Sequence, residues 1–381
     1  MQSALDSATL MAAKDAANLS AAELSTKAEG YFRAMYTRAE MTGVEVTTVY
    51  TVQSGSTPAS VLMTSSGDMT TEFMGIIGFK KMTLKTSSTA SWANTKLRVA
   101  LALDVTGSMD YDGKMNAMQT AATKLVTTLS KSAAADGDVY ISVVPFAKDV
   151  NIGKSHVNQN YIDWTDWDKE NKSCDKKGKN CTPDDHDTWN GCVTDRTKPH
   201  DTTGTPAISY ATDFPAEQYD ACPKQLLPLS YDFAAVKTKI DSLQPKGGTN
   251  QPIGLFWAWW TLRSNAPFVA PAKDPNYSYV TAIILFTDGD NTQQRDPSYG
   301  DGQHQSGTKI DDRQRILCDN VKADGVTLYT IMVNTSGAPT QTVLPYCASS
   351  PDKFFMLTSA SQIMTAFDTI GASLSKLRIA K

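Results

Sequence analysis

The chain has 381 residues, of which 41% are hydrophobic and 20% are charged, and its formal net charge is −4. This length and apolar content are enough for one large hydrophobic core together with a smaller domain. The small net charge, without a basic stripe along the sequence, excludes nucleic acid as an expected partner. The sequence contains no apolar run of about 18 residues, the length that a membrane-spanning helix requires.

Residues 1–93 are expected to form an N-terminal domain with a long helix followed by a small antiparallel sheet. Met1 to Arg38 is rich in alanine with few helix breakers, and it predicts one long helix. Val44 to Val52 alternates apolar and polar side chains, as a half-buried strand does. Its predicted partner is Thr57 to Thr64. A short helix at Met69 to Gly78 and a strand at Lys81 to Ser88 complete this domain.

A cluster of oxygen-bearing residues follows the next predicted strand. The apolar run from Leu97 to Leu103 predicts a buried strand, and Asp104, Thr106 and Ser108 come directly after it at alternate positions. Alternate side chains of an extended chain point the same way, so these three can converge on one point. Converging carboxylate and hydroxyl oxygens suit Mg²⁺. The alternative is a plain strand-to-helix turn, in which Asp, Thr, Gly and Ser are also common.

Two distant segments favour the metal interpretation. The stretch from Gly247 to Asn250 contains Thr249 and precedes an apolar, helix-like run, and a second buried strand beginning at Ile283 ends in Asp288. Doubly wound sheets place their ligands at the carboxyl ends of the strands. Thr249 and Asp288 are therefore expected to lie beside the loop that holds Asp104.

Strands and helices alternate through the rest of the chain. This alternation predicts an α/β fold, a doubly wound and mostly parallel sheet covered by helices on both faces. The aromatic run from Phe256 to Trp260 is interpreted as a helix face packed against the sheet. The remaining predicted helices are Lys114 to Ser130, Phe233 to Leu243, Asp311 to Ala323 and Ser359 to Leu377, and the remaining strands are Val139 to Phe146, Val326 to Val333 and Lys353 to Leu357.

Residues 151–228 form a predicted insertion that contains four of the six cysteines. A structureless loop of that length is unusual in a compact domain, so we expect a small folded excursion. Six cysteines allow fifteen pairings, and the sequence does not specify one. The absence of C-x-x-C pairs favours disulfides over zinc, with reduced buried cysteines as the other alternative. The preferred pairing joins sequence neighbours: Cys174–Cys181, Cys192–Cys222 and Cys318–Cys347. Disulfides point to the periplasm or the cell surface.

The five oxygen-bearing residues resemble the metal-ion-dependent adhesion site (MIDAS) of von Willebrand factor A (vWA) domains. That site has D-x-[ST]-x-S in its first loop, Thr in the second and Asp in the third, which Asp104, Thr106, Ser108, Thr249 and Asp288 match. The resemblance implies a Rossmann-like vWA domain at residues 94–381, with the insertion inside it. It implies Mg²⁺, with Mn²⁺ or Ca²⁺ as alternatives, held for binding rather than catalysis. An acidic group of a protein partner would complete the coordination.

A second resemblance concerns the N-terminal part of the chain. Gln2 to Leu10 is similar to the stretch after the membrane helix in tight-adherence (Tad) pilus assembly proteins of the TadE/TadG type, and the helix-plus-strands order is pilin-like. Those proteins join such a helix to a C-terminal A domain. The resemblance implies a periplasmic or cell-surface protein, anchored by a membrane helix upstream of Met1, with pilus or envelope assembly proteins as partners.

Two other functions remain as alternatives. One is a vWA scaffold subunit of a metal-regulated machine, as in chelatase-associated A domains; these are cytosolic, so oxidised cysteines would argue against it. The other is a hydrolase in which the ion activates water, with Asp290 as the best available base. No Ser/His/Asp or Cys/His set can be placed by motif, so we do not expect an enzyme. The acidic run from Asp184 to Asp187 is interpreted as a solvated loop, with a second cation as the alternative.

Overall fold

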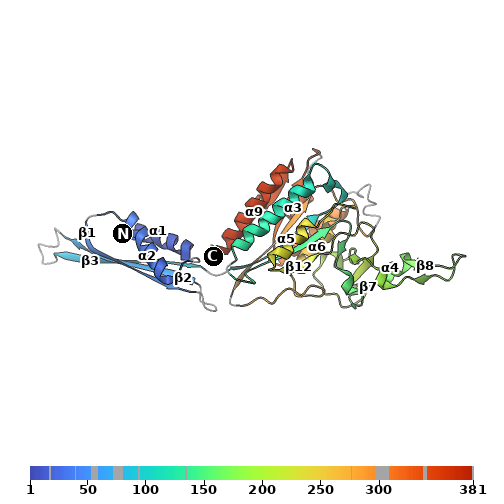
Figure 1. Cartoon of the computed structure of the whole chain (residues 1–381), viewed down its shortest axis with the longest axis horizontal. Coiled ribbons are helices and arrows are strands. Elements are labelled where there is room, and N and C mark those ends of the chain that lie inside the picture. Colours follow the sequence, from blue (N-terminus) through green and yellow to red (C-terminus); the bar gives the residue numbers. More distant parts are fainter. Residues whose placement is uncertain are drawn as a thin grey trace. The chain divides into compact units, whose positions relative to one another are not determined.

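The computed structural model (Figure 1) describes residues 1–16, 19–38, 40–52, 59–71, 80–92, 95–133, 135–275, 277–296, 309–337 and 341–379. The chain divides into two compact units. The first consists of Met1–Thr95 with the short segments Asp274–Ser278 and Leu377–Lys381, and the second of Lys96–Lys273 and Tyr279–Lys376.

The N-terminal unit is a three-stranded antiparallel sheet with two helices on one face. The strands are β1 (Met41–Thr51), β2 (Ala59–Thr70) and β3 (Lys81–Trp92), in the order β1-β2-β3. Alternate residues of β2, Val61 and Met63 among them, point into the core, as the two-residue period of a strand requires. They pack against helix residues Leu5, Ala8, Ala12, Ala16, Leu24, Ala28 and Phe32.

The prediction of one long helix was wrong, because two helices form. They are α1 (Gln2–Asp15) and α2 (Ala21–Met35). Ser20 starts the second: its hydroxyl accepts the Glu23 N–H at 3.3 Å, and the Glu23 carboxylate accepts the Ser20 N–H at 2.9 Å. This reciprocal capping box satisfies backbone donors that would otherwise be orphaned. Breaking the helix lets both halves lay their apolar stripes on the same sheet.

The strand predictions of this unit are confirmed, but the predicted helix at Met69 to Gly78 is not. Met69 and Thr70 belong to β2 and pair with β3, and residues 72–79 lie outside the described residues.

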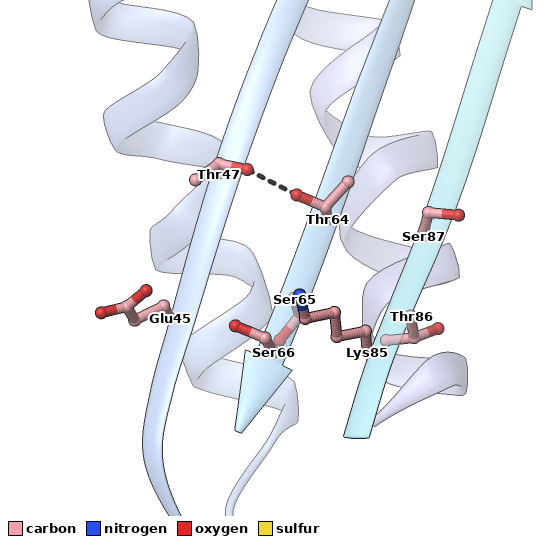
Figure 2. Close-up of a pocket in the computed structure, with 8 residues that line it drawn as sticks. All are labelled: Glu45, Thr47, Thr64, Ser65, Ser66, Lys85, Thr86 and Ser87. Carbon is pink, nitrogen blue, oxygen red and sulfur yellow. Dashed lines mark hydrogen bonds between the residues drawn. The ribbon is translucent and has the colours of Figure 1, made fainter. Parts of the chain in front are cut away.

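The sheet also carries a polar pocket of about 410 Å³, shown in Figure 2 with the Thr47–Thr64 hydroxyl contact. Its lining comes from all three strands: Glu45, Thr47, Thr64, Ser65, Ser66, Lys85, Thr86 and Ser87.

The second unit confirms the predicted α/β class with its mostly parallel central sheet. The central strands lie in the order β15-β14-β13-β4-β5, and the pairs β15–β14, β14–β13 and β4–β5 are parallel. Their bounds are β4 Thr95–Asp104, β5 Val139–Phe146, β13 Ser278–Thr287, β14 Thr327–Val333 and β15 Phe354–Leu357.

Helices cover both faces of this sheet, so its strands are buried on both sides. In β4, Val99, Leu101 and Leu103 join one apolar cluster, while Ala100 and Ala102 join the other. The first cluster is closed by α3 (Lys114–Lys131), α5 (Phe233–Asp241) and α9 (Ser361–Ile379), with α3 and α9 side by side in Figure 1. The second is closed by α6 (Gln251–Thr261), α7 (Lys309–Ala323) and α8 (Val343–Cys347).

The insertion is folded, as predicted, and extends the sheet. Strand β6 (Val150–Asn151) pairs antiparallel with β5 and leads to β10 (Cys192–Val193), β11 (Phe214–Glu217) and β7 (Ile162–Asp163). Strand β12 (Leu227–Ser230) returns the chain to β5 and pairs antiparallel with it, on the edge that β4 leaves free. The short pieces in between are α4 (Thr165–Glu170), β8 (Lys172–Ser173) and β9 (Thr182–Pro183).

The aromatic run in α6 packs on the insertion as well as on the sheet, which the sequence did not indicate. The Phe214 ring of the insertion lies 4.7 Å from Trp257 and 5.3 Å from Trp260, centroid to centroid. All three side chains are buried, and so is the helix from Gln251 to Thr261. The interpretation of these aromatics as core residues is therefore confirmed.

The three predicted disulfides are confirmed: Cys174–Cys181, Cys192–Cys222 and Cys318–Cys347. The described residues contain no free cysteine. Disulfides of this number are typical of proteins from oxidising compartments. None of the helices in the described ranges combines the length and the apolar character needed to cross a bilayer.

Candidate metal centre

Asp104 is the deepest of the five predicted site residues. It ends β4 and is completely buried. Its Oδ1 accepts the Thr106 N–H at 2.8 Å, and its Oδ2 accepts the hydroxyl of Thr287, the last residue of β13, at 2.6 Å. Burial raises the pKa of Asp104 to about 7, and the charge of Asp288 adds to the rise. The carboxylate is thus held rigidly in a place where its charge is poorly solvated.

Asp288 brings the first and third loops together. It directly follows β13, the strand next to β4 in the sheet. The Ser108 hydroxyl donates to Asp288 Oδ1 at 2.6 Å, and the hydroxyls of Thr106 and Ser108 are 3.1 Å apart. Ser108 itself is exposed, whereas the other four predicted residues are buried. Asp104, Thr106, Ser108 and Asp288 therefore form one polar cluster that opens to solvent at Ser108.

The loop that carries Thr249 contacts this cluster through backbone hydrogen bonds. The Gly107 N–H donates to the Gly247 carbonyl at 3.0 Å, which ties the second loop to the first. Thr249 N–H donates to the Thr292 hydroxyl, and Thr292 N–H donates back to the Thr249 carbonyl, both at 2.9 Å. Among the described contacts, the Thr249 hydroxyl makes no hydrogen bond to the other four residues. The structure brings the Thr249 loop alongside them without linking its side chain to theirs.

Gly247 is required by the shape of the second loop. Its φ is +96°, a conformation that L side chains rarely adopt. A Cβ atom here would lie 2.5 Å from the Tyr219 hydroxyl and 3.0 Å from the Ala221 Cβ. The glycine thus allows the insertion to pack closely against the loop that carries Thr249.

Lys114 is a member of the cluster that the sequence reasoning missed. Its Nζ pairs with Asp288 Oδ2, and the side chains of the pair are 8% and 0% exposed. Lys114 is the first residue of α3, where a positive charge opposes the helix dipole. That unfavourable position is the signal that could have pointed to a role outside the helix. Thr287 and Thr292, which orient Asp104 and Thr249, were also missed.

The donor set suits a hard divalent cation. Two buried carboxyl groups face one ammonium. Once Asp104 is ionised, above its raised pKa of about 7, the cluster therefore has one negative charge that no described side chain compensates. The other side chains offer hydroxyl oxygens, which Mg²⁺ accepts together with carboxylates. No group of three His, Cys, Asp or Glu side chains that could hold a metal occurs in the described parts of the chain. A cation here would depend on hydroxyl oxygens and water as well as on Asp104 and Asp288.

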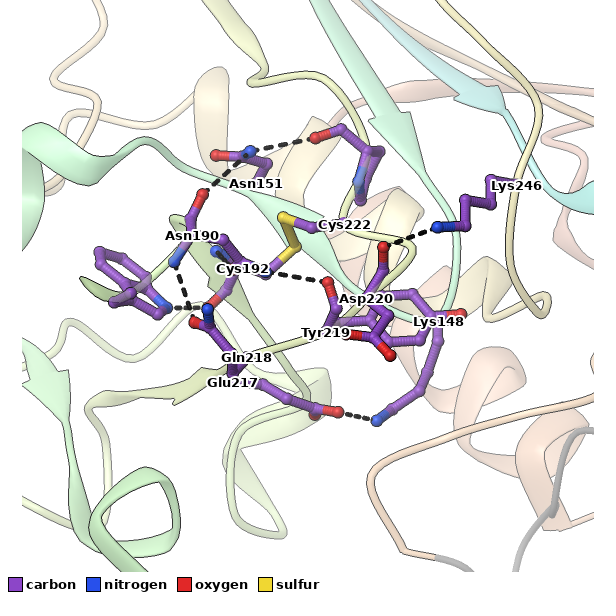
Figure 3. Close-up of a disulfide and its surroundings, with 12 residues drawn as sticks. Lys148, Asn151, Asn190, Cys192, Glu217, Gln218, Tyr219, Asp220, Cys222 and Lys246 are labelled. Carbon is purple, nitrogen blue, oxygen red and sulfur yellow. Dashed lines mark hydrogen bonds and ion pairs between the residues drawn. A yellow bond between two sulfur atoms is a disulfide. The ribbon is translucent and has the colours of Figure 1, made fainter. Parts of the chain in front are cut away.

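The disulfide-bonded insertion supports the second loop (Figure 3). The Cys192–Cys222 bridge holds the segment from Glu217 to Asp220 in place. From this segment the Tyr219 hydroxyl accepts the Gly248 N–H at 3.1 Å, and the Asp220 carbonyl accepts a hydrogen bond from Lys246 Nζ at 2.9 Å. The insertion therefore forms hydrogen bonds with the residues on both sides of Gly247 and stabilises this loop.

Two other sequence interpretations can be placed. Asp290, the base considered for a hydrolase, is exposed and accepts a hydrogen bond from the Gln341 amide. In the acidic run, Asp185 caps a short helical turn through the Asp187 N–H, and Asp184 accepts the Ser173 hydroxyl at 2.7 Å. These contacts, and the exposure of Asp185 and Asp187, agree with the interpretation of that run as a solvated loop.

No family model matches the sequence, and no curated protein sequence matches it significantly. Solved structures are similar in fold. The vWF domain of the type V pili tip protein Mfa5 from Porphyromonas gingivalis is 12% identical, covers 76% of this chain and 97% of that one, and has a TM-score of 0.45. The pilus adhesin SpaC from Lactobacillus rhamnosus GG is also 12% identical, covers 87% of this chain and has a TM-score of 0.45.

A third similar structure is proximal thread matrix protein 1 from the mussel byssus, described with a zinc-occupied MIDAS motif. It is 15% identical, with a TM-score of 0.38, over 73% of this chain and 47% of that one. This chain spans only about a third (35%) of the length of SpaC.

Proposed function

We propose that residues 94–381 form a vWA-type domain that binds a protein partner through a cation, with the insertion at residues 151–228 inside it. Asp104, Thr106, Ser108, Thr249 and Asp288 would hold Mg²⁺, or Mn²⁺ or Ca²⁺ in its place. The observation that carries the proposal is the convergence of four of these side chains, from loops 180 residues apart, in one hydrogen-bonded cluster with excess negative charge.

The surface around the cluster supports a binding role. Ser108 is exposed, and Tyr111, three residues further on, is 68% exposed. Aromatic side chains are enriched in protein interfaces relative to the rest of the surface. A bound cation would supply an open coordination position for an acidic group of the partner, Asp or Glu. The chain's own residues would hold the ion and leave that position accessible at Ser108.

We further propose that the protein is a component of a Tad-type pilus assembly or a pilus-associated adhesin. The three disulfides support a location in the periplasm or at the cell surface. The helices and antiparallel sheet of residues 1–93 support a pilin-like N-terminal domain. The disulfides count against the cytosolic scaffold alternative.

The test of the metal site is thermal unfolding with and without Mg²⁺. A ligand that binds only the folded state stabilises it by about 2.7 kcal/mol at a hundredfold excess over its Kd. We expect Mg²⁺ to raise the Tm of the wild type and to leave Asp104→Ala, Thr249→Ala and the near-isosteric Thr249→Val unchanged. Asp136→Asn, in the exposed turn before β5, is the control and should respond like the wild type. Equal Mg²⁺ shifts in all variants would refute the site.

The partner can be sought in native envelopes. The wild type and Thr249→Val would be used as bait, each with Mg²⁺ and with a chelator. Pilus machinery retained only by the wild type with Mg²⁺ would support the pilus assignment, whereas a host or matrix receptor would support an adhesin outside it. If the wild type captures the same proteins with Mg²⁺ and with the chelator, binding through the ion is contradicted.

A further inference from the structure

Asp149 is a completely buried carboxyl group beside the insertion of the second unit. It lies in the turn between β5 and β6, is 0% exposed, and neither of its carboxylate oxygens has a hydrogen-bond partner. The neighbouring Lys148 directs its ammonium to Glu217, as Figure 3 shows. Burying an ionised carboxylate without partners is very costly. Such a carboxyl group either binds a proton, as its raised pKa allows, or takes up a cation.

Two more buried oxygens without partners belong to the segments around Asp149. Asn250 is 0% exposed, and its Oδ1 has no partner. The orientation of this amide is fixed, because its Nδ2 donates to the Lys148 carbonyl at 3.1 Å and to Asp195 Oδ2 at 2.8 Å. Thr194, at the end of β10, is 5% exposed and its hydroxyl is also unpaired. The unsatisfied atoms are thus all oxygens.

Backbone contacts bring these segments together. The Asn250 N–H donates to the Ala147 carbonyl at 3.2 Å, and the Ala147 N–H donates to the Asp149 carbonyl at 3.1 Å. From the insertion, the Thr194 hydroxyl lies close enough to favour the charged form of Asp149, against the effect of burial, which raises the pKa of this carboxyl. The turn after β5 therefore lies beside the Asn250 loop. The pairing of Val193 with Val150 also brings the end of β10 to this turn.

We propose that Asp149, Asn250 and Thr194 form a Ca²⁺ site that fastens the insertion to the core of the second unit. Ca²⁺ accepts carboxylate, amide and hydroxyl oxygens in flexible geometry, whereas Mg²⁺ keeps several waters and demands a near-ideal octahedron. These three oxygen donors are buried, which suits the less hydrated ion. The absence of cysteine and histidine from the set excludes a typical zinc site.

This site is distinct from the cluster at Asp104, although Asn250 follows Thr249 directly. A cation at Asp149 would join two elements that flank the Thr249 loop, the turn at Ala147 and the end of β10. It would therefore hold that loop in place without contributing a coordination position to a partner. Its removal is expected to loosen the insertion rather than to abolish Mg²⁺ binding at Asp104.

The experiment is a Ca²⁺ titration of the full chain, followed by calorimetry and by thermal unfolding. The variants are Asp149→Asn, which removes the charge at constant shape, Thr194→Val, which removes the hydroxyl, and the exposed control Asp136→Asn. A fourth variant, Asp104→Ala, eliminates the other cluster. We expect Ca²⁺ to raise the Tm of the wild type, Asp136→Asn and Asp104→Ala. When combined with Asp104→Ala, the Asp149→Asn substitution should abolish the Ca²⁺ shift and Thr194→Val should reduce it.

The outcomes separate the two sites. Two independent cation sites are supported if the Asp149→Asn variant still responds to Mg²⁺ and the Asp104→Ala variant still responds to Ca²⁺. If Ca²⁺ does not change the Tm of the Asp104→Ala variant, the proposal is overturned. A proton or an ordered water molecule would then satisfy Asp149. An undiminished shift when Asp149→Asn is combined with Asp104→Ala would overturn it as well. If Asp149→Asn does not fold, Thr194→Val combined with Asp104→Ala decides, because an unchanged Ca²⁺ affinity in that variant refutes the site.

Discussion

Lys114 and Asp288 form a buried ion pair within the candidate metal centre. The ammonium of Lys114 contacts Asp288 Oδ2, while Asp288 Oδ1 accepts the Ser108 hydroxyl. Both oxygens of this carboxylate are therefore engaged by groups of the chain. A cation that enters the cluster has to compete with the lysine for the same negative charge. This competition makes the strength of metal binding depend on a residue outside the predicted set.

Replacing Lys114 by methionine tests that competition. Breaking a buried ion pair by removing one partner typically costs about 3–5 kcal/mol. We expect Lys114→Met to lower the Tm of the metal-free protein and to enlarge the Mg²⁺-induced rise, because two buried carboxylates are then left without a counter-charge. Lys124→Met on the same helix, whose ion pair with Asp368 is exposed, should change either quantity little. A reduced Mg²⁺ response in Lys114→Met would instead make the lysine part of the metal site.

The raised pKa of Asp104 predicts a pH dependence of metal binding. The folded-state pKa is about 7, above the ordinary value of 3.8, so ionisation is less favourable in the folded protein. The contribution of Asp104 to the free energy of unfolding of the metal-free protein is therefore largest below about pH 4. It falls as the pH rises towards about 7. A proton also competes with the cation. The apparent Mg²⁺ affinity should fall by up to about tenfold for each pH unit below the pKa.

The measurement is a set of Mg²⁺ titrations by calorimetry between about pH 5 and pH 8. Asp104→Asn provides the reference for stability, since it cannot titrate at this position. The difference in Tm between the metal-free wild type and Asp104→Asn should change with pH in the stated direction. A Mg²⁺ affinity that is flat across this range would show that Asp104 is already ionised without the metal.

The Cys192–Cys222 bridge is predicted to support metal binding from a distance. Replacing both cysteines by alanine should cost about 2–4 kcal/mol, the usual effect of opening a loop of this size. It should also reduce the Mg²⁺-induced shift, because Tyr219 would no longer be held against the Gly248 N–H. The matched control is the Cys174–Cys181 pair, both exposed, whose removal should leave the Mg²⁺ shift unchanged. Equal effects on the Mg²⁺ shift would contradict a supporting role specific to the first bridge.

Gly247 allows a sharper test of the second loop. Gly247→Ala combines a backbone strain of about 1–2 kcal/mol with a close contact to the Tyr219 hydroxyl. Gly325→Ala carries a similar positive φ, +76°, but its added Cβ meets nothing within 4 Å. We expect both variants to lose stability in chemical unfolding, and only Gly247→Ala to lose the Mg²⁺ response. Intact Mg²⁺ binding in Gly247→Ala would show that the position of this loop is not critical.

Most of the regular elements were predictable because their patterns are local. The strand at Val139 to Phe146 has the predicted bounds, and the helix that starts at Lys114 differs by one residue at its end. The long N-terminal helix was mistaken because an alanine-rich composition hides the break before Ser20. The capping box there is short, and its consequence, two helices packed on one sheet, appears only when the sheet is present.

For the candidate site, the sequence by itself determined the residue types, the order of the three loops and the edge of the sheet to which they belong. Parallel strands end at a common edge, so Asp104 and Asp288 had to meet there. Only the tertiary structure decided which charges share that edge. Lys114 beside Asp288, Tyr219 against Gly248 and the unsatisfied Asp149 all depend on contacts between segments far apart in the chain. Such contacts are set by packing in three dimensions, and a linear pattern does not contain them.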